Sequence, residues 1–169
     1  MSAEIFDDIA QFAQSLPRQP RQPHARGLAG LDLGDKTIGV AISDTRLATA
    51  TPILTVKRRK FTTDAAELLT VLDKHEICGI VLGLPRNMDG SEGPRCQKTR
   101  AFARNLAQLT ELPITFWDER LSTVAAERAL LEADTTRKRR AEVIDHVAAA
   151  YILQGALDRL GHLRQADER

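Results

Sequence analysis

Gly30-Leu31-Asp32-Leu33-Gly34-Asp35-Lys36-Thr37-Ile38-Gly39-Val40-Ala41 is the stretch of this sequence that decides the fold. The stretch overlaps two apolar segments, 28–33 and 37–43, that have the composition of strands. The Gly34-Asp35-Lys36 tripeptide between them is typical of a tight turn. The segment Ile53–Val56 is also strand-like. Because strands this close in sequence tend to pair with one another, the stretch predicts an antiparallel meander.

Beyond residue 60, helical and strand periodicities alternate along the chain. We expect strands over 79–84 and 113–117, and helices over 63–75, 95–109, 122–133 and 141–160. Thr63 or Asp64 is the expected N-cap of the first of these helices. A meander followed by alternating helices and strands predicts an α/β fold, with a mixed five-stranded sheet and helices on both faces.

The chain of 169 residues divides into three parts. Residues 1–26 form an N-terminal extension, in which a short amphipathic helix precedes a linker rich in proline and arginine. Residues 27–162 have the length of one ordinary domain with its own core. Residues 163–169 form a polar tail.

Composition is typical of a globular protein of the cytoplasm. Hydrophobic residues make up 43% of the chain, and its longest apolar runs, such as Ile77–Leu84, are too short to cross a bilayer. The N-terminus lacks the basic start and apolar stretch of a secretory signal. Cys78 and Cys96 form no CxxC pair, so they indicate neither a metal site nor a disulfide. We therefore expect a cytoplasmic protein with no membrane partner.

The net charge of +1 does not by itself identify a nucleic-acid-binding protein, but the charge is distributed unevenly. Lys57–Lys60 and Arg137–Arg140 are both runs of four basic residues. Either run alone is more typical of a solvated loop. Two runs in one short domain, beside a set of carboxylates, are equally compatible with contacts to phosphate groups.

Acidic residues stand at three informative positions. Asp32 lies near the end of an apolar strand, before a glycine turn, and Asp118 and Glu119 end another strand. Asp145 flanks the apolar stripe of the last helix. Each acid alone has an ordinary explanation as a turn cap, a helix-start acid or a boundary acid. Because neighbouring strand residues point to opposite faces, only one of Asp118 and Glu119 needs to share a cleft with Asp32.

Gathered together, such acids form a recognised kind of metal site. Mg²⁺ and Mn²⁺ prefer oxygen ligands, usually a few carboxylates with several waters. Two such ions activate a water and stabilise the leaving oxygen of a phosphodiester. The pattern therefore predicts phosphodiester chemistry if the three positions meet in the fold.

Four motifs resemble those of the YqgF/RuvX family, in the same order along the chain. They are Gly30–Ala41, Gly83–Pro94, Asp118–Thr123 with Ala126-Glu127, and Arg137–Arg140 before Ile144–Ala149. The resemblance implies an RNase H-like fold and metal-dependent cleavage of structured nucleic acid. The substrate is then either a four-way DNA (Holliday) junction or the 5′ end of precursor 16S rRNA. Thr37 departs from the arginine that is common in the family at this position.

The resemblance also implies roles for individual residues. Asp32, Glu119 and Asp145 are the expected catalytic metal ligands, and Asp118 is kept as the alternative ligand to Glu119. The glycine-rich loop 87–94 lets backbone N–H groups approach a phosphate. Arg120 is interpreted either as a phosphate contact or as a partner of nearby acids. The residues expected to bind nucleic acid are Lys36, Arg86, Arg95, Arg120, Arg137 and Lys138.

Two other classes of function remain as alternatives. One is a non-catalytic module that binds nucleic acid or the ribosome. The other is an ATP-binding domain of the actin and sugar-kinase type, which needs a second domain that a chain of this length cannot supply. Symmetrical resolution of a four-way junction requires a homodimer, whereas trimming of RNA does not.

Overall fold

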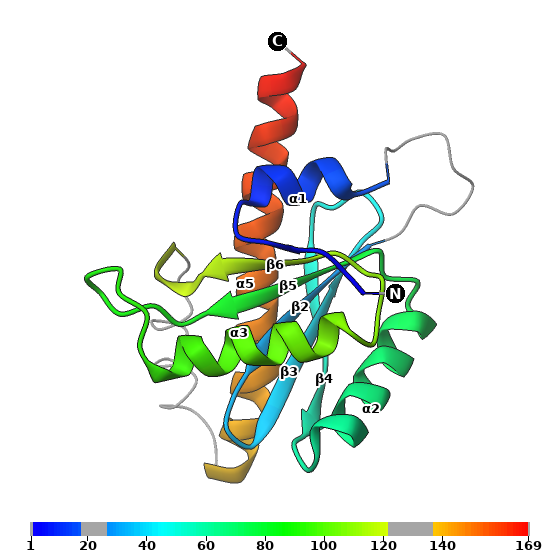
Figure 1. The fold of residues 1–169 in the computed structure, drawn as a ribbon. Helices are drawn as coiled ribbons and strands as arrows, with labels where there is room; N and C mark the ends of the chain where they lie inside the picture. The colour runs from blue at the N-terminus through cyan, green and yellow to red at the C-terminus, as the bar shows by residue number, and fades with distance from the viewer. Residues whose placement is uncertain (1, 18–26, 122–136, 169) are drawn as a thin grey trace.

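The computed structural model describes residues 2–17, 27–121 and 137–168, with the side chains of 137–145 excepted (Figure 1). The expected helix 122–133 therefore lies outside the described residues. In chain order the elements are β1 (Ile5–Phe6), α1 (Ile9–Ser15), β2 (Leu28–Leu33), β3 (Thr37–Ser43), β4 (Ala50–Lys57), α2 (Phe61–Lys74), β5 (Gly79–Leu84), α3 (Pro94–Ala107), β6 (Ile114–Asp118), the 3₁₀ helix η1 (Glu119–Leu121) and α5 (Arg137–Asp167).

The strands form one mixed sheet in the order β1-β6-β5-β2-β3-β4. Strands β2, β3 and β4 pair antiparallel, which confirms the predicted meander, and β5 and β6 run parallel to β2. The predicted count of five strands is wrong, because Ile5 and Phe6 pair with Ile114 and Thr115 as a sixth strand at the edge. A strand of two residues has no periodicity to detect in the sequence.

The N-terminal segment packs against the rest of the chain. Phe12 of α1 is fully buried in the cluster that α5 forms with the sheet, and its ring meets Phe6 edge-on with centroids 6.2 Å apart. The Thr115 hydroxyl donates to the carbonyl oxygen of Phe6 at 2.9 Å. At the other end, α5 continues to Asp167, past the expected start of a polar tail. The three-part division of the chain stays a prediction.

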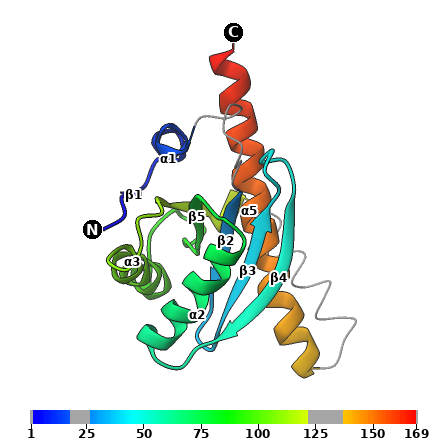
Figure 2. The same ribbon diagram turned by 90° about the vertical axis from the view of Figure 1, so that its right-hand side faces the viewer.

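Helices cover both faces of the sheet, as the sequence predicts (Figure 2). Ala29, Leu31 and Leu33 of β2 pack in one core cluster with α2 and α3. Since side chains alternate along a strand, Gly30 and Asp32 face the other side, where α5 lies. Although α5 has 31 residues, no helix among the described residues is both long and apolar enough to cross a membrane.

Helix α2 begins earlier than its expected N-cap. Its first residue is Phe61, and Lys60 occupies the N-cap position without a side-chain hydrogen bond. The prediction that Thr63 or Asp64 caps the helix is therefore wrong. Asp64 is instead buried and accepts hydrogen bonds from the backbone N–H of Arg59 at 2.9 and 3.1 Å. The hydrogen bonds from the N–H of Arg59 to the buried Asp64 carboxylate hold the connection between β4 and α2 against the helix.

Helix α5 approaches the sheet so closely that glycine is required on both sides of the contact. A Cβ atom on Gly30 would lie 2.6 Å from the Cβ of Leu153 and 2.9 Å from the carbonyl oxygen of Ala149. A Cβ on Gly155 of the helix would lie 2.8 Å from Nε1 of Trp117. No real Cβ tolerates these separations, so any side chain at Gly30 forces the helix away from the sheet.

We predict that Gly30→Ala lowers the free energy of unfolding by about 1–3 kcal/mol, because its methyl group meets helix backbone that cannot rotate away. Gly161→Ala is the matched control, since Gly161 lies in the same helix and a Cβ there has nothing within 4 Å. The control should raise stability by up to about 1 kcal/mol through helix propensity. Urea unfolding of both variants provides the measurement, and equal stability of Gly30→Ala and the wild type would contradict the close approach.

Candidate active site

Asp32 lies near the C-terminal end of β2 and faces α5. Its side chain is 5% exposed, although it is an acid in an otherwise apolar strand. The chain then turns at Gly34, whose N–H donates to the carbonyl oxygen of Thr37 at 2.9 Å. An acid at the end of an apolar strand, followed by a glycine turn that lets a ligand approach the backbone, is a candidate for a functional side chain.

Glu119 is the first residue of η1, directly after β6, and its side chain reaches the same face of the sheet. Its Oε1 atom lies 3.0 Å from the position that a Cβ would occupy on Gly83, and Ile152 of α5 lies beside that position. The missing side chain of Gly83 thus leaves room for the carboxylate over β5. Glycine inside a strand often marks such a close approach.

Asp32 and Glu119 also lie at the same level of the sheet. Leu31 of β2 pairs with Leu82 of β5, so the residues that follow, Asp32 and Gly83, are neighbours on adjacent strands. Neighbouring strands are about 4.8 Å apart. The carboxylate that covers Gly83 therefore lies beside Asp32, on the face covered by α5.

Asp145 belongs to α5, one helical turn before Ala149, whose carbonyl oxygen lies over Gly30. Its side chain lies outside the described residues, so its predicted meeting with Asp32 and Glu119 stays a prediction. Within the part of the chain whose side chains are described, no group of three or more acids, histidines and cysteines is placed to hold a metal ion.

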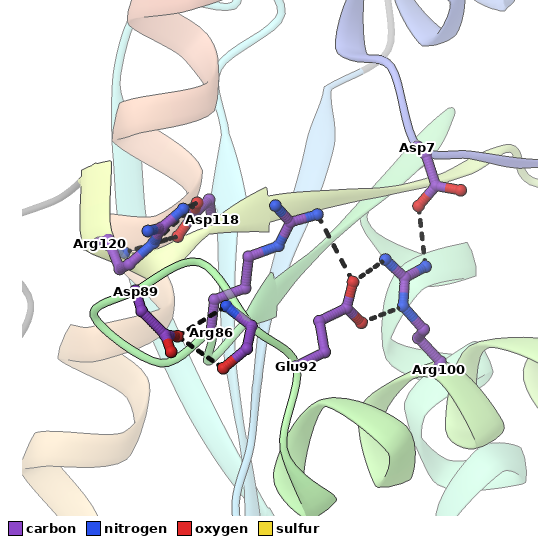
Figure 3. Close-up of polar contacts among 8 residues, drawn as sticks. Asp7, Arg86, Asp89, Glu92, Arg100, Asp118 and Arg120 are labelled. Carbon is purple, nitrogen blue, oxygen red and sulfur yellow. Dashed lines mark hydrogen bonds and ion pairs between the residues drawn. The ribbon is translucent and has the colours of Figure 1, made fainter.

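Asp118 points to the opposite face and is held by Arg120 (Figure 3). Nη2 of Arg120 lies 2.7 Å from Oδ2 of Asp118, and its backbone N–H donates to Oδ1 at 3.0 Å. The guanidinium also donates to the carbonyl oxygen of Met88 at 3.3 Å. The hydrogen bonds from Arg120 lower the pKa of Asp118 below its ordinary value. The sequence predicts that Arg120 either contacts a phosphate or pairs with a nearby acid, and in the structure it pairs with Asp118.

A second polar network lies beside this pair and connects three segments (Figure 3). Arg100 of α3 donates through Nη2 to Glu92 at 2.9 Å and through Nη1 to Asp7 at 2.8 Å. Its guanidinium also lies 4.8 Å from the ring centroid of Phe116. Arg86 lies 3.6 Å from Glu92. Arg100 lowers the pKa of Glu92, and this network holds the glycine-rich loop against α3.

The other residues expected to bind nucleic acid divide into two groups. Lys36, in the turn after β2, and Arg95, in the first turn of α3, are exposed to solvent. Arg137 and Lys138 begin α5, and their side chains lie outside the described residues. Arg86 is half-buried, and its Nε atom is buried with no hydrogen-bond partner among the described residues.

Sequence reasoning missed two features that shape the site. It did not assign Gly83 the role of making room for Glu119, although glycine inside an apolar strand is a recognisable signal of close approach. It also missed the network centred on Arg100. No local pattern predicts that Asp7 and Glu92 meet one arginine.

Comparison with known proteins agrees with the motifs. The family model described as "RuvX: Holliday junction resolvase" matches residues 26–159. A protein of Ruegeria pomeroyi, named "Putative pre-16S rRNA nuclease", is 70% identical over 94% of this chain and 99% of its own length. A protein of Roseobacter denitrificans with the same name is 66% identical over 98% of this chain and 99% of its own length.

Comparison with solved structures finds RuvC of Thermus thermophilus in complex with a Holliday junction substrate. Its TM-score is 0.47 at 13% sequence identity, over 80% of this chain and 96% of that chain. The yeast mitochondrial Holliday junction resolvase Ydc2 has a TM-score of 0.45 at 13% identity, over 95% of this chain and 88% of its own.

We predict that Arg120→Gln raises the pKa of Asp118 toward its ordinary value of about 3.9. A carboxyl with a lowered pKa stabilises the folded state above about pH 4, and this contribution is lost as the pH falls through the folded-state pKa. A carbon-13 NMR titration of the Asp118 carboxyl would measure the shift. Asp44 is the control, because backbone N–H groups, chiefly that of Thr49, lower its pKa without Arg120. An unchanged pKa of Asp118 would contradict the pairing.

Proposed function

Because the chain belongs to the RuvX family, whose description is Holliday junction resolvase, we propose that it is a metal-dependent endonuclease that cleaves structured nucleic acid. The match covers residues 26–159, and the mixed sheet with helices on both faces agrees with the RNase H-like fold implied by the motifs. The observation that carries the proposal is the position of Asp32 and Glu119, which come from distant segments to one face and one level of the sheet.

Asp32, Glu119 and Asp145 are the proposed ligands of Mg²⁺ or Mn²⁺. The carboxylate of Glu119 beside the end of β2 fits such a group, because hard divalent ions take carboxylate oxygens. The bound metal would supply an activated water and stabilise the leaving oxygen of the phosphodiester. Asp32 and Glu119 would hold the metal ion, and the apolar side chain of Ile152 lies beside Glu119. Asp118 is better explained as the partner of Arg120.

The substrate we favour is precursor 16S rRNA, cleaved near its 5′ end in the cytoplasm. This choice rests on relatives with that name that are 63–70% identical to this chain over nearly its whole length. A four-way DNA junction is the second candidate, because the family description names it. Junction resolution would need a homodimer that presents two sites, whereas RNA trimming would not. Lys36, Arg86, Arg95, Arg120, Arg137 and Lys138 are the proposed contacts to phosphate groups.

We predict that Asp32→Asn, Glu119→Gln and Asp145→Asn each reduce single-turnover cleavage by more than about 100-fold. Loss of an outer partner of a metal ligand already costs about 10–100-fold in activity, and a direct ligand should cost more. Asp118→Asn, with its carboxyl on the other face, should cost less than about 10-fold. The assay compares labelled precursor 16S rRNA with a four-way DNA junction in Mg²⁺ and in Mn²⁺, and a chelator should abolish cleavage.

Binding of the same probes in a chelator serves as the control for folding, since all four variants should bind as well as the wild type. An equal loss of activity in Asp118→Asn and Glu119→Gln would show that the roles of these two acids are assigned wrongly. Binding of either probe without cleavage by the wild type would instead favour the alternative of a non-catalytic nucleic-acid- or ribosome-associated module.

A further inference from the structure

The basic run Lys57–Lys60 lies at the end of the sheet where Asp32 is found. It joins β4 to α2 next to the turn between β2 and β3, and both connections lie at the same end of the molecule (Figures 1 and 2). The backbone N–H of Arg58 donates to the carbonyl oxygen of Lys36 at 2.9 Å. Nη1 of Arg58 donates to the carbonyl oxygen of Gly34 at 2.7 Å. The run is therefore fastened to the turn that follows Asp32.

The four residues of the run do not have the same role. Arg58 is half-buried, and its guanidinium lies 6.0 Å from the ring centroid of Phe102 in addition to its bond to the turn. The side chains of Lys57, Arg59 and Lys60 are exposed. Among the described residues, none of these three cations forms an ion pair. One member of the run thus anchors the backbone, and three members present positive charge to solvent.

The surroundings of the three exposed cations are also basic. Lys36 is exposed in the adjoining turn, and the acid of that turn, Asp35, lies 3.8 Å from Lys98. The backbone of the first turns of α5, which carry the second basic run, lies toward the same end of the molecule (Figures 1 and 2). The acids nearest the run are Asp64, which is buried and bound to the backbone N–H of Arg59, and Asp35, which lies beside Lys98. An ordinary solvated loop lacks such an anchored backbone.

Strand register places Lys57 on the same face as the active-site acids. Asp32 pairs with Gly39, and Gly39 pairs with Thr55, so these three residues form one row across the sheet. The Thr55 hydroxyl lies 3.1 Å from Nδ1 of His146 in α5, so this row lies on the face of the sheet that α5 covers. Lys57 is two residues further along β4 and therefore shares that face. From the strand spacing and rise, its Cα lies about 12 Å from that of Asp32.

We propose that Lys57, Arg59 and Lys60 form a phosphate-binding surface that holds the nucleic-acid backbone beside the cleavage site. This inference rests on the proposed nuclease function and extends it to a substrate surface outside the acids and the glycine-rich loop. The ligand is the phosphodiester backbone itself, since side chains of this kind contact phosphates without selecting bases. Arg58 is a positioning residue, because it holds the run against the turn.

The test is a triple variant, Lys57→Gln with Arg59→Gln and Lys60→Gln, measured by fluorescence anisotropy without divalent metal. The probes are the 5′ region of precursor 16S rRNA and a four-way DNA junction, so that the two sources of phosphodiester backbone are compared. The control is Lys74→Gln with Arg104→Gln and Arg159→Gln, which removes the same charge from exposed positions elsewhere. A further variant exchanges lysine and arginine at the three positions and keeps their charge. Thermal unfolding confirms that each variant is folded.

We expect the triple variant to bind at least one probe about 10-fold or more weakly, and the slope of log Kd against log salt to fall by about 2 to 3 units. The control and the charge-conserving variant should stay within about 2-fold of the wild type, with unchanged slopes. Equal losses in the triple variant and the control would overturn the proposal, as would wild-type affinity in the triple variant. Absence of binding by the wild type to both probes would overturn it as well.

Failure of this proposal can be distinguished from failure of the proposed nuclease function. A wild type that binds through these three residues but cleaves neither probe in Mg²⁺ or Mn²⁺ supports the surface and contradicts the nuclease. A wild type that cleaves, combined with full affinity in the triple variant, contradicts only the surface.

Discussion

Helix α5 lies directly against the backbone of the sheet, and the candidate site depends on this contact. Gly30 and Gly83 provide flat places on β2 and β5, where a Cβ would collide with Leu153 or Ile152. Because the two layers are so close, Ile152 of α5 lies beside the carboxylate of Glu119 over β5. A larger separation would expose both acids to more solvent and weaken their electrostatic interactions.

The pleat of the sheet gives Asp118 and Glu119 different environments although they are neighbours in the chain. Phe116 packs with α3, and Trp117 packs with α5, so the chain alternates between two separate cores. Asp118 follows Phe116 by two residues and meets Arg120, whereas Glu119 follows Trp117 by two residues and covers Gly83. The same physical alternation explains why one acid is neutralised by an arginine while the other lies beside a second carboxylate.

Arg100 connects the glycine-rich loop with the N-terminal segment on the α3 face. Its hydrogen bonds to Glu92 and Asp7 raise its own pKa and keep it charged, and the ring of Phe116 covers part of its guanidinium. The side chain of Arg100 is 21% exposed, so it interacts more strongly with its partners than a fully solvated arginine would. The glycine-rich loop, α3 and the N-terminal segment are thus linked through the guanidinium of Arg100.

The sequence by itself determined the meander, the alternating helices and strands, and the acids that were candidates for chemistry, because periodicity and turn composition are local properties. It did not determine the sixth strand, the start of α2, or the separate role of Arg58 within a basic run. These depend on contacts between residues far apart in the chain, such as the pairing of Ile5 with Ile114. The tertiary structure also decided between Asp118 and Glu119 as the neighbour of Asp32, because the face of an acid after a strand follows from packing on both sides of the sheet.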